Sequence, residues 1–324
     1  MPKVSVIIPN YNYCRYLQER VETVLNQTFQ DFEIILLDDC STDGSQKLLR
    51  EYAKNPKVTH YVENDVNTGS PFKQWLRGLE LASGEYVWIA ESDDFADCHF
   101  LEYTVKALDE NPSAAFVATC SQFVDEKDNN IDADWDWVPL DGCMSLYPAK
   151  KYIRYLLFWD NTVYNASMVL LRKTAYLSAN KRFADMRFSG DWMLWIDMLK
   201  HGDVIKINRR LSFFRQHNKR VTVTSEKTVE RFRESMEINR NIWQDFSTNA
   251  LLRWCRMGVE YKKVLRDKSY SSEQRQRLLH VLNDYGVTRF HYYCERIAKT
   301  ISQLLPFMRL RDKNLKCIAK TPLS

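Results

Sequence analysis

Residues 4–12 have the sequence VSVIIPNYN, an apolar run that ends at a proline and polar residues. Such a run is typical of a buried strand in a parallel sheet, whose two faces are covered by helices. Residues 17–25 then place Leu and Val at helical spacing, and residues 32–37 form a second apolar run that stops at Asp38. The first forty residues therefore predict a strand, a helix and a second strand.

The same alternation continues to about residue 120. We expect further strands at 57–62, 86–90 and 114–119, and helices at 45–52, 72–81 and 101–108. Alternating strands and helices build a parallel sheet with helices on both faces. From residue 226 onward the spacing of apolar residues predicts helices alone.

The composition excludes several classes of protein. Of 324 residues, 45% are apolar and 27% charged, which is typical of a globular chain. No apolar run approaches the ~20 residues of a membrane-spanning helix. Met-Pro-Lys leads directly into a strand-like run, so no signal peptide is expected. The eight cysteines form no CxxC pair and no zinc-site spacing, which predicts free thiols in a reducing cytosol.

Polar clusters follow four of the expected strands, at residues 10–12, 38–39, 64–69 and 91–94. In open parallel sheets, ligands bind just outside the carboxyl ends of the strands. Four clusters in this position predict one binding site along that edge.

Residues 91–94, ESDD, place three carboxylates on one turn. Unpaired, they would repel one another and raise their own pKa values. A divalent cation such as Mg²⁺ or Mn²⁺ removes that conflict, usually through one or two carboxylates together with substrate phosphates. The alternative is an acidic helix start, which the helix dipole favours.

Two further aspartates are candidates for function. Asp39 can accept hydrogen bonds from a base or a ribose, but the first turn lacks the glycines that a dinucleotide pyrophosphate requires, so NAD binding is disfavoured. Asp191 falls in the first turn of an apolar helix, where its ionised form is favoured, and it is a candidate general base. A simple capping role is the alternative for Asp191.

Seven short motifs occur in order along the first hundred residues. They are VSVIIPNYN (4–12), QTF (27–29), DFE (31–33), DDCSTDGS (38–45), NTG (67–69), GEY (84–86) and ESDD (91–94). Through these motifs the chain resembles the family 2 glycosyltransferases over residues 1–217. That resemblance implies a GT-A fold, which is a Rossmann-like, mixed, mostly parallel sheet flanked by helices. Residues 218–324 would form a basic helical extension.

The resemblance implies a site for a nucleoside-diphosphate sugar. Pro9, Tyr11 and Asn12 would line the base pocket, Asp39 would bind the base edge, and Lys73 would lie near the nucleotide. The donor and its Mn²⁺ or Mg²⁺ would also be bound by the DXD-like residues Glu91, Ser92 and Asp93, with Asp93 as metal ligand, and by His217, from the late motif Arg215-Gln216-His217.

On the acceptor side, the resemblance makes Asp191 the base that deprotonates the attacking hydroxyl, with inversion at the anomeric carbon. Gly190 stands where the family often has Glu. Asp94, Trp135, Trp137 and Trp192 are candidate acceptor contacts, although the spacing of Trp192 and Trp195 also fits core packing.

The charge distribution divides the chain. Residues 251–324 carry 16 Lys and Arg against 6 Asp and Glu, a formal +10, which leaves −6 for residues 1–250. A basic amphipathic helix near residues 297–308 suits an anionic membrane surface, and packing on the protein or on a second subunit is the alternative. The basic residues are remote from any nucleic-acid-binding module, so no nucleic acid is expected.

We therefore predict an inverting, metal-dependent glycosyltransferase of the cytoplasm or the inner face of the membrane. The donor would be a nucleoside-diphosphate sugar, with UDP favoured. The acceptor would be a hydroxyl of a glycan or a lipid-linked acceptor in cell-surface polysaccharide or glycoconjugate synthesis. A non-catalytic nucleotide-sugar-binding protein is the alternative. A nucleotidyltransferase is disfavoured because residues 9–13 lack a glycine-rich, basic phosphate loop.

Overall fold

The computed structural model describes residues 1–133, 135–217, 229–246, 248–304 and 315–323. The chain divides into two compact units. The first contains residues 1–149, 162–217 and 317–324, and the second contains residues 150–161 and 218–316.

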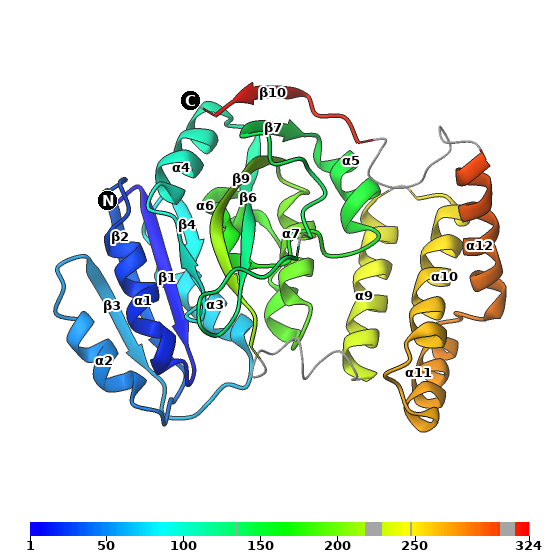
Figure 1. Cartoon of the computed structure of the whole chain (residues 1–324), viewed down its shortest axis with the longest axis horizontal. Coiled ribbons are helices and arrows are strands. Elements are labelled where there is room, and N and C mark those ends of the chain that lie inside the picture. Colours follow the sequence, from blue (N-terminus) through cyan, green and yellow to red (C-terminus); the bar gives the residue numbers. More distant parts are fainter. Residues whose placement is uncertain (134, 218–228, 247, 305–314, 324) are drawn as a thin grey trace. The chain divides into compact units, whose positions relative to one another are not determined.

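The amino-terminal half of unit 1 is a parallel sheet in the order β3-β2-β1-β4 (Figure 1). Side chains alternate across each strand, so Val6 of β1 packs with α1 and α4, whereas Ile7 faces Gly78 of α3 on the opposite side. This explains the continuous apolar runs, because both faces of the sheet are covered. The elements are β1 (Val4–Asn10), α1 (Cys14–Leu25), β2 (Phe32–Asp38), α2 (Ser45–Tyr52), β3 (Val58–Glu63), α3 (Pro71–Leu81), β4 (Tyr86–Ile89), β5 (Phe95–Ala96) and α4 (Phe100–Glu110).

The second half of unit 1 makes the sheet mixed. From β4 the order continues β8-β6-β9-β7-β10, with β6 and β9 parallel and the other neighbours antiparallel. The predicted mixed, mostly parallel sheet flanked by helices is thereby confirmed. The elements are β6 (Ala114–Val124), β7 (Cys143–Tyr147), the 3₁₀ turn η2 (Ala166–Met168), β8 (Val169–Arg172), α6 (Lys173–Ser178), the 3₁₀ turn η3 (Arg182–Asp185), α7 (Gly190–Met198) and β9 (Asp203–Arg215).

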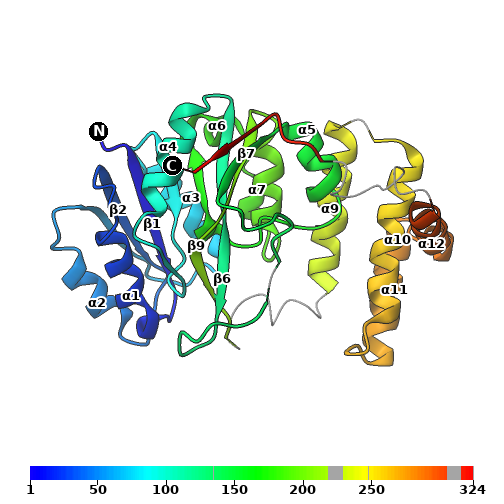
Figure 2. The same ribbon diagram turned by 45° about the horizontal axis from the view of Figure 1, so that its top comes forward.

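The expected division at residue 217 differs from the two units in two places. Residues 150–161 belong to unit 2, where the Phe158 carbonyl accepts a hydrogen bond from Arg256 Nε at 2.7 Å. Near the carboxyl terminus, where only helices were predicted, β10 (Ala319–Pro322) pairs with β7 (Figure 2). All four β10 residues are exposed, so the strand depends on backbone pairing that no local pattern indicates.

Unit 2 is helical, as the apolar spacing predicted. In both views α10, α11 and α12 lie side by side (Figures 1 and 2). A small core that includes Phe232, Met236, Val264 and Leu282 joins α9, α10 and α11. None of the described helices combines the length and apolar character needed to cross a membrane. The elements are α5 (Ala149–Tyr152, at the junction of the units), the π-helical turn η1 (Ile153–Leu157), α9 (Val229–Asp245), α10 (Ala250–Arg266), α11 (Ser272–Asp284) and α12 (Arg289–Leu304).

Candidate active site

The polar segments after β1, β2 and β4 meet at one edge of the sheet. Asn10 pairs with Asp38 at the ends of β1 and β2, and Asn10 Nδ2 donates to Asp38 Oδ1 at 2.9 Å. Ser92, after β4, is buried and donates from Oγ to the Pro9 carbonyl at 2.7 Å. Hydrogen bonds between neighbouring strand ends therefore fix the relative positions of these loops.

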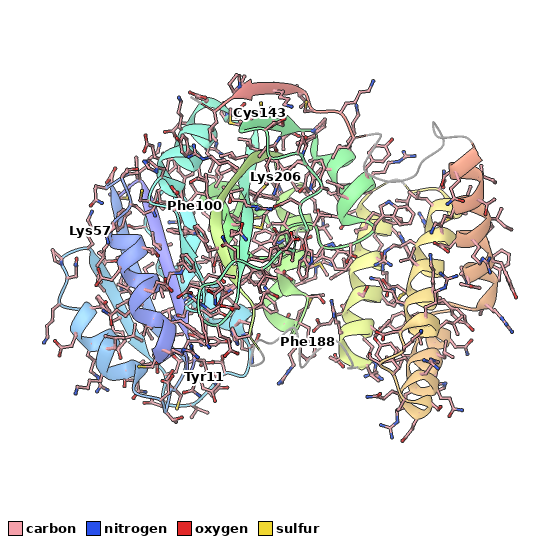
Figure 3. All side chains as sticks on the ribbon, viewed as in Figure 1. Tyr11, Lys57, Phe100, Cys143, Phe188 and Lys206 are labelled. Atoms are coloured by element: carbon pink, nitrogen blue, oxygen red, sulfur yellow. The ribbon has the colours of Figure 1, made fainter. Side chains whose placement is uncertain are left out.

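The loop after β1 leaves one aromatic ring exposed. Asn12 has a φ of 59°, a left-handed conformation that asparagine tolerates, and its Oδ1 accepts from the Thr42 amide at 2.7 Å. Tyr11 is 47% exposed and lies near the lower edge of the molecule in Figure 3. Lys73, on the first turn of α3, is also exposed. Tyr11 and Lys73 are thus accessible to a ligand, whereas Pro9 is buried.

Asp39 is the centre of a dense hydrogen-bond cluster. Its Oδ1 accepts from Asn64 Nδ2 (2.8 Å), the Thr68 amide (2.9 Å) and Gln74 Nε2 (2.9 Å), and its Oδ2 accepts from Thr68 Oγ1 (2.8 Å) and Asn67 Nδ2 (3.1 Å). A carboxylate offers about four lone-pair positions. These bonds occupy them, so Asp39 anchors the segment between β3 and α3 in this structure.

Both the backbone and the side chain of Glu91 form hydrogen bonds. Its amide donates to Ser167 Oγ at 3.1 Å, and its carbonyl accepts from Arg20 Nε at 2.8 Å. Its side-chain Oε1 accepts from Trp75 Nε1 at 2.6 Å. The longer arm of glutamate, compared with aspartate, therefore reaches the indole of α3.

The other end of the acidic turn is tied to β9. Arg215 donates from Nε to the Asp93 carbonyl at 2.8 Å and from its amide to Asp94 Oδ1 at 3.0 Å. Asn165 Nδ2 donates to Asp94 Oδ2 at 2.8 Å, and Asp94 is buried. The carboxylate of Asp94 therefore faces inward and orders the turn, and its contact with the acceptor stays a prediction.

The turn concentrates negative charge in a poorly hydrated place. Burial, and then the charge of Asp93, raise the pKa of Glu91 to about 8. Burial and Asp93 also raise the pKa of Asp94. Arg20 is fully buried beneath the turn; burial lowers its pKa to about 10, so it stays charged at neutral pH. One buried arginine thus offsets part of the charge of the three carboxylates.

Asp93 and His217 form the pair that fits a divalent cation. His217 Nε2 lies 2.9 Å from Asp93 Oδ2, and the imidazole packs edge-on against Tyr13 with ring centroids 5.5 Å apart. Carboxylate oxygen suits Mn²⁺ and Mg²⁺, and imidazole nitrogen is a common ligand of transition metals. The donor chemistry and the excess negative charge of the turn are consistent with such an ion.

Gly190 shows why only one carboxylate begins α7. A Cβ at this position would lie 2.4 Å from the Phe183 carbonyl oxygen and 2.7 Å from the Phe72 ring, so no larger side chain fits. The Phe72 ring contacts Trp75, with centroids 5.0 Å apart, and Trp75 in turn binds Glu91. Gly190 is thus connected to Glu91 of the acidic turn through the side chains of Phe72 and Trp75. Asp191 follows Gly190, and its Oδ1 accepts from the Trp192 amide at 2.7 Å.

The tryptophans fall into two groups. Trp192 is 5% exposed and nearly every side chain of α7 is buried, which favours the core-packing alternative for Trp192. Its contact with the acceptor stays a prediction. Trp135 is exposed beside Phe123, at a centroid distance of 4.9 Å, and Trp137 is half-buried against Tyr147. Phe188, which precedes α7, lies near the lower edge of the molecule in Figure 3, as Tyr11 does.

A polar hollow of about 450 Å³ lies beside Arg215. Its lining includes Arg15, Glu19, Glu126 and Asp128, but neither Asp93 nor His217. Arg215 pairs with Glu19 at 2.5 Å and with Asp128, so the opposing charges of the hollow are matched within the protein. The hollow is therefore a weaker candidate for the donor site than the strand-end edge.

Comparison with known proteins decides the family. The family model described as glycosyl transferase family 2 matches residues 5–178, just over half of the chain. The chain belongs to this family. The matched region contains the acidic turn, Asp39 and the loop after β1.

Two curated relatives are similar over most of their lengths. A Bacillus subtilis glycosyltransferase named for teichuronic acid biosynthesis is 28% identical over 231 residues, 71% of this chain and 85% of that protein. A Campylobacter jejuni protein named GalNAc(5)-diNAcBac-PP-undecaprenol beta-1,3-glucosyltransferase is 26% identical over 235 residues, 71% of each.

Two solved structures show the same fold. S. aureus TarS 1–349, in complex with UDP-GlcNAc, aligns with a TM-score of 0.67 at 17% identity, covering 95% of this chain and 87% of that one. The mannosyltransferase PcManGT of Pyrobaculum calidifontis, in complex with GDP-Man and Mn²⁺, aligns with a TM-score of 0.53 at 16% identity, covering 94% and 88%. The predicted GT-A fold is confirmed.

Sequence reasoning missed several residues that build the site. Trp75, Asn165 and Ser167 lie far from the acidic turn in sequence, and no local pattern connects them to it. Arg20, in contrast, could have been recognised from its position in the sequence. It occupies a buried position between Leu17 and Val24 on the apolar face of α1, where an arginine needs a buried partner.

Proposed function

We propose that this family 2 glycosyltransferase transfers a sugar, with inversion, from a nucleoside-diphosphate sugar to an acceptor hydroxyl. The observation that carries the proposal is the Asp93–His217 pair at the edge where β1, β2 and β4 end. When bound there, Mn²⁺ or Mg²⁺ would neutralise charge on the leaving diphosphate. Asp93 and His217 would hold this ion, and Glu91 and Ser92 would shape the turn beneath the donor.

In this proposal the protein's own groups orient the two substrates. Tyr11 and Asn12 would contact the base, with Pro9 and Asp39 fixing the loops behind them and Lys73 near the nucleotide. Asp191 would act as the general base that removes the proton of the attacking hydroxyl. General-base catalysis typically raises the reaction rate by about 10²–10⁴-fold. One base opposite one leaving group gives inversion. Trp135 and Trp137 are proposed acceptor contacts.

The nature of the substrates is proposed from relatives. TarS 1–349 was solved with UDP-GlcNAc and PcManGT with GDP-Man and Mn²⁺, and we propose UDP as the nucleotide here. The names of the two curated relatives refer to teichuronic acid and to an undecaprenol-linked glycan, which supports a glycan or lipid-linked acceptor in cell-surface polysaccharide synthesis. Residues 1–217 would catalyse, and residues 218–324 would bring the enzyme to the inner face of the membrane.

The experiment is a transfer assay with Asp191→Asn. Donor hydrolysis and transfer are measured with UDP-sugars and Mn²⁺, and UDP affinity is measured by calorimetry. We expect transfer to fall at least ~100-fold while UDP affinity stays unchanged, because the base acts only on the acceptor. Near-normal turnover would remove Asp191 from this role. Nucleotide-sugar binding without any turnover by the wild type would favour the non-catalytic alternative.

A further inference from the structure

The solvent side of α12 carries an apolar stripe. Phe290, Tyr293, Ile297 and Ile301 are each between 39% and 61% exposed. They are spaced by three and four residues, so they lie along one face of the helix. Trp254 of α10, 40% exposed, extends the stripe through an edge-on contact with Phe290 at a centroid distance of 5.4 Å.

Packing within unit 2 keeps this stripe turned outward. A Cβ at Gly258 of α10 would lie 2.1 Å from the His291 carbonyl oxygen, so the two helices touch closely through the opposite face of α12. On that inner face, Glu295 pairs with Lys262 Nζ at 2.6 Å. The apolar stripe therefore cannot turn into the core without breaking these contacts.

Cations border the stripe. Arg289 and Arg296 are exposed beside one edge of the stripe, and within the described residues no carboxylate lies at ion-pair distance from them. Glu295 is the one acidic residue in the α12 sequence, and it is buried. The accessible surface of α12 is thus apolar along its centre and purely cationic at its border.

We propose that the stripe of α12, with Trp254, binds the surface of an anionic lipid bilayer. An interfacial helix buries its apolar side chains at the headgroup level while its cations face anionic headgroups. Tyr293 and Trp254 are amphipathic aromatics of the kind enriched at membrane interfaces. This inference deepens the membrane contact of the proposed function and rests on it, but it is independent of the donor and of the metal.

The test is flotation of the full-length protein with vesicles of phosphatidylcholine, with and without phosphatidylglycerol. We expect flotation only with phosphatidylglycerol, and less of it at high salt. Arg296→Glu should weaken binding by at least about fivefold, since one cation near an anionic surface contributes about that factor. Ile297→Asp should weaken it further. The matched control is Leu177→Asp on α6, because Leu177 is 59% exposed and Ile297 is 61%.

Three results would overturn the inference: no flotation by the wild type, flotation that Ile297→Asp leaves intact, or an equal loss in Leu177→Asp. Light scattering tests the alternative that a second copy of the chain binds the stripe. If the wild type does not float but forms a dimer that Ile297→Asp dissociates, the stripe is a self-association surface. Melting curves exclude misfolding. UDP-sugar hydrolysis by the same variants should be unchanged, so a failure of the catalytic proposal is seen separately.

Discussion

Glu91 stands where the related DXD motif begins, and its extra methylene places the carboxylate against Trp75. The indole N–H donates to Oε1 at 2.6 Å, and Trp75 is itself fixed between Phe72 and Trp195. Removing one partner of a buried hydrogen bond, so that the other is left unsatisfied, typically costs about 1–3 kcal/mol. Trp75 is therefore the side chain that sets the direction of Glu91.

Trp75→Phe keeps an aromatic ring in place and removes the donor. We predict that KM for the UDP-sugar rises about tenfold or more, because Glu91 loses its orientation, while kcat changes less. Steady-state kinetics at saturating Mn²⁺ measure both constants. The control is Trp243→Phe, the same substitution at a tryptophan that packs against the core of unit 2. Equal KM values in the two variants would contradict the assignment.

Single residues of the site were predictable where a local pattern carried them. Asp39 and Asp93 follow apolar runs, and the ends of neighbouring strands must meet at one edge. The bonds that these residues make were not predictable. Asp39 takes its donors from residues 64–74, and Asp94 takes one from Asn165, because the fold and not the local sequence brings those segments together.

At the scale of elements, a buried ion pair lies on α10 of the helical unit. Arg256 and Glu260 face each other one turn apart on α10, both buried, and Lys263 Nζ lies 3.4 Å from the same Glu260 oxygen. Although burial opposes ionisation, the charges of Lys263 and Arg256 lower the pKa of Glu260 to about 2. The usual pKa of glutamate is about 4.3.

This difference makes unit 2 sensitive to acid. A carboxyl whose pKa is lower in the folded state stabilises the fold above its unfolded pKa, and that contribution is lost as the pH falls toward the folded pKa. We predict a loss of about 3 kcal/mol of unfolding free energy between about pH 5 and pH 2. Chemical denaturation followed by circular dichroism measures it.

The Glu260→Gln variant removes the titrating group. It should be less stable than the wild type at neutral pH, because Arg256 loses its buried partner, and the difference should shrink in acid. Glu273→Gln is the control, since the Glu273–Arg277 pair is exposed and should contribute little. A difference between wild type and Glu260→Gln that does not vary with pH would refute this account of Glu260.

Most elements were predictable from periodicity, and the exceptions share a cause. The alternation over residues 4–119 predicted the strands and helices of the sheet's first half within a few residues. The strand β10 was not predicted, nor was it predicted that residues 150–161 belong to unit 2. Each depends on contacts with segments more than 90 residues away, such as Phe158 with Arg256.

For the whole molecule, the proposed ligands should appear as added stability. A ligand that binds only the folded state raises the melting temperature by mass action. We predict that UDP-sugars with Mn²⁺ raise it more than UDP-sugars alone, and more than GDP- or TDP-sugars with Mn²⁺. A thermal-shift screen over these combinations measures the effect, and a larger shift with GDP-sugars would replace UDP as the proposed nucleotide.

The most direct test of the central claim is a calorimetric titration of UDP into the full-length protein, with Mn²⁺ and with chelator. The claim is that the turn after β4, through Asp93 and His217, holds the ion that binds the donor diphosphate. We predict that Mn²⁺ strengthens UDP binding to the wild type and to the control Asp97→Asn, and that Asp93→Asn loses this dependence. Equal UDP affinity with and without Mn²⁺ in the wild type, or an unchanged Mn²⁺ dependence in Asp93→Asn, would contradict it.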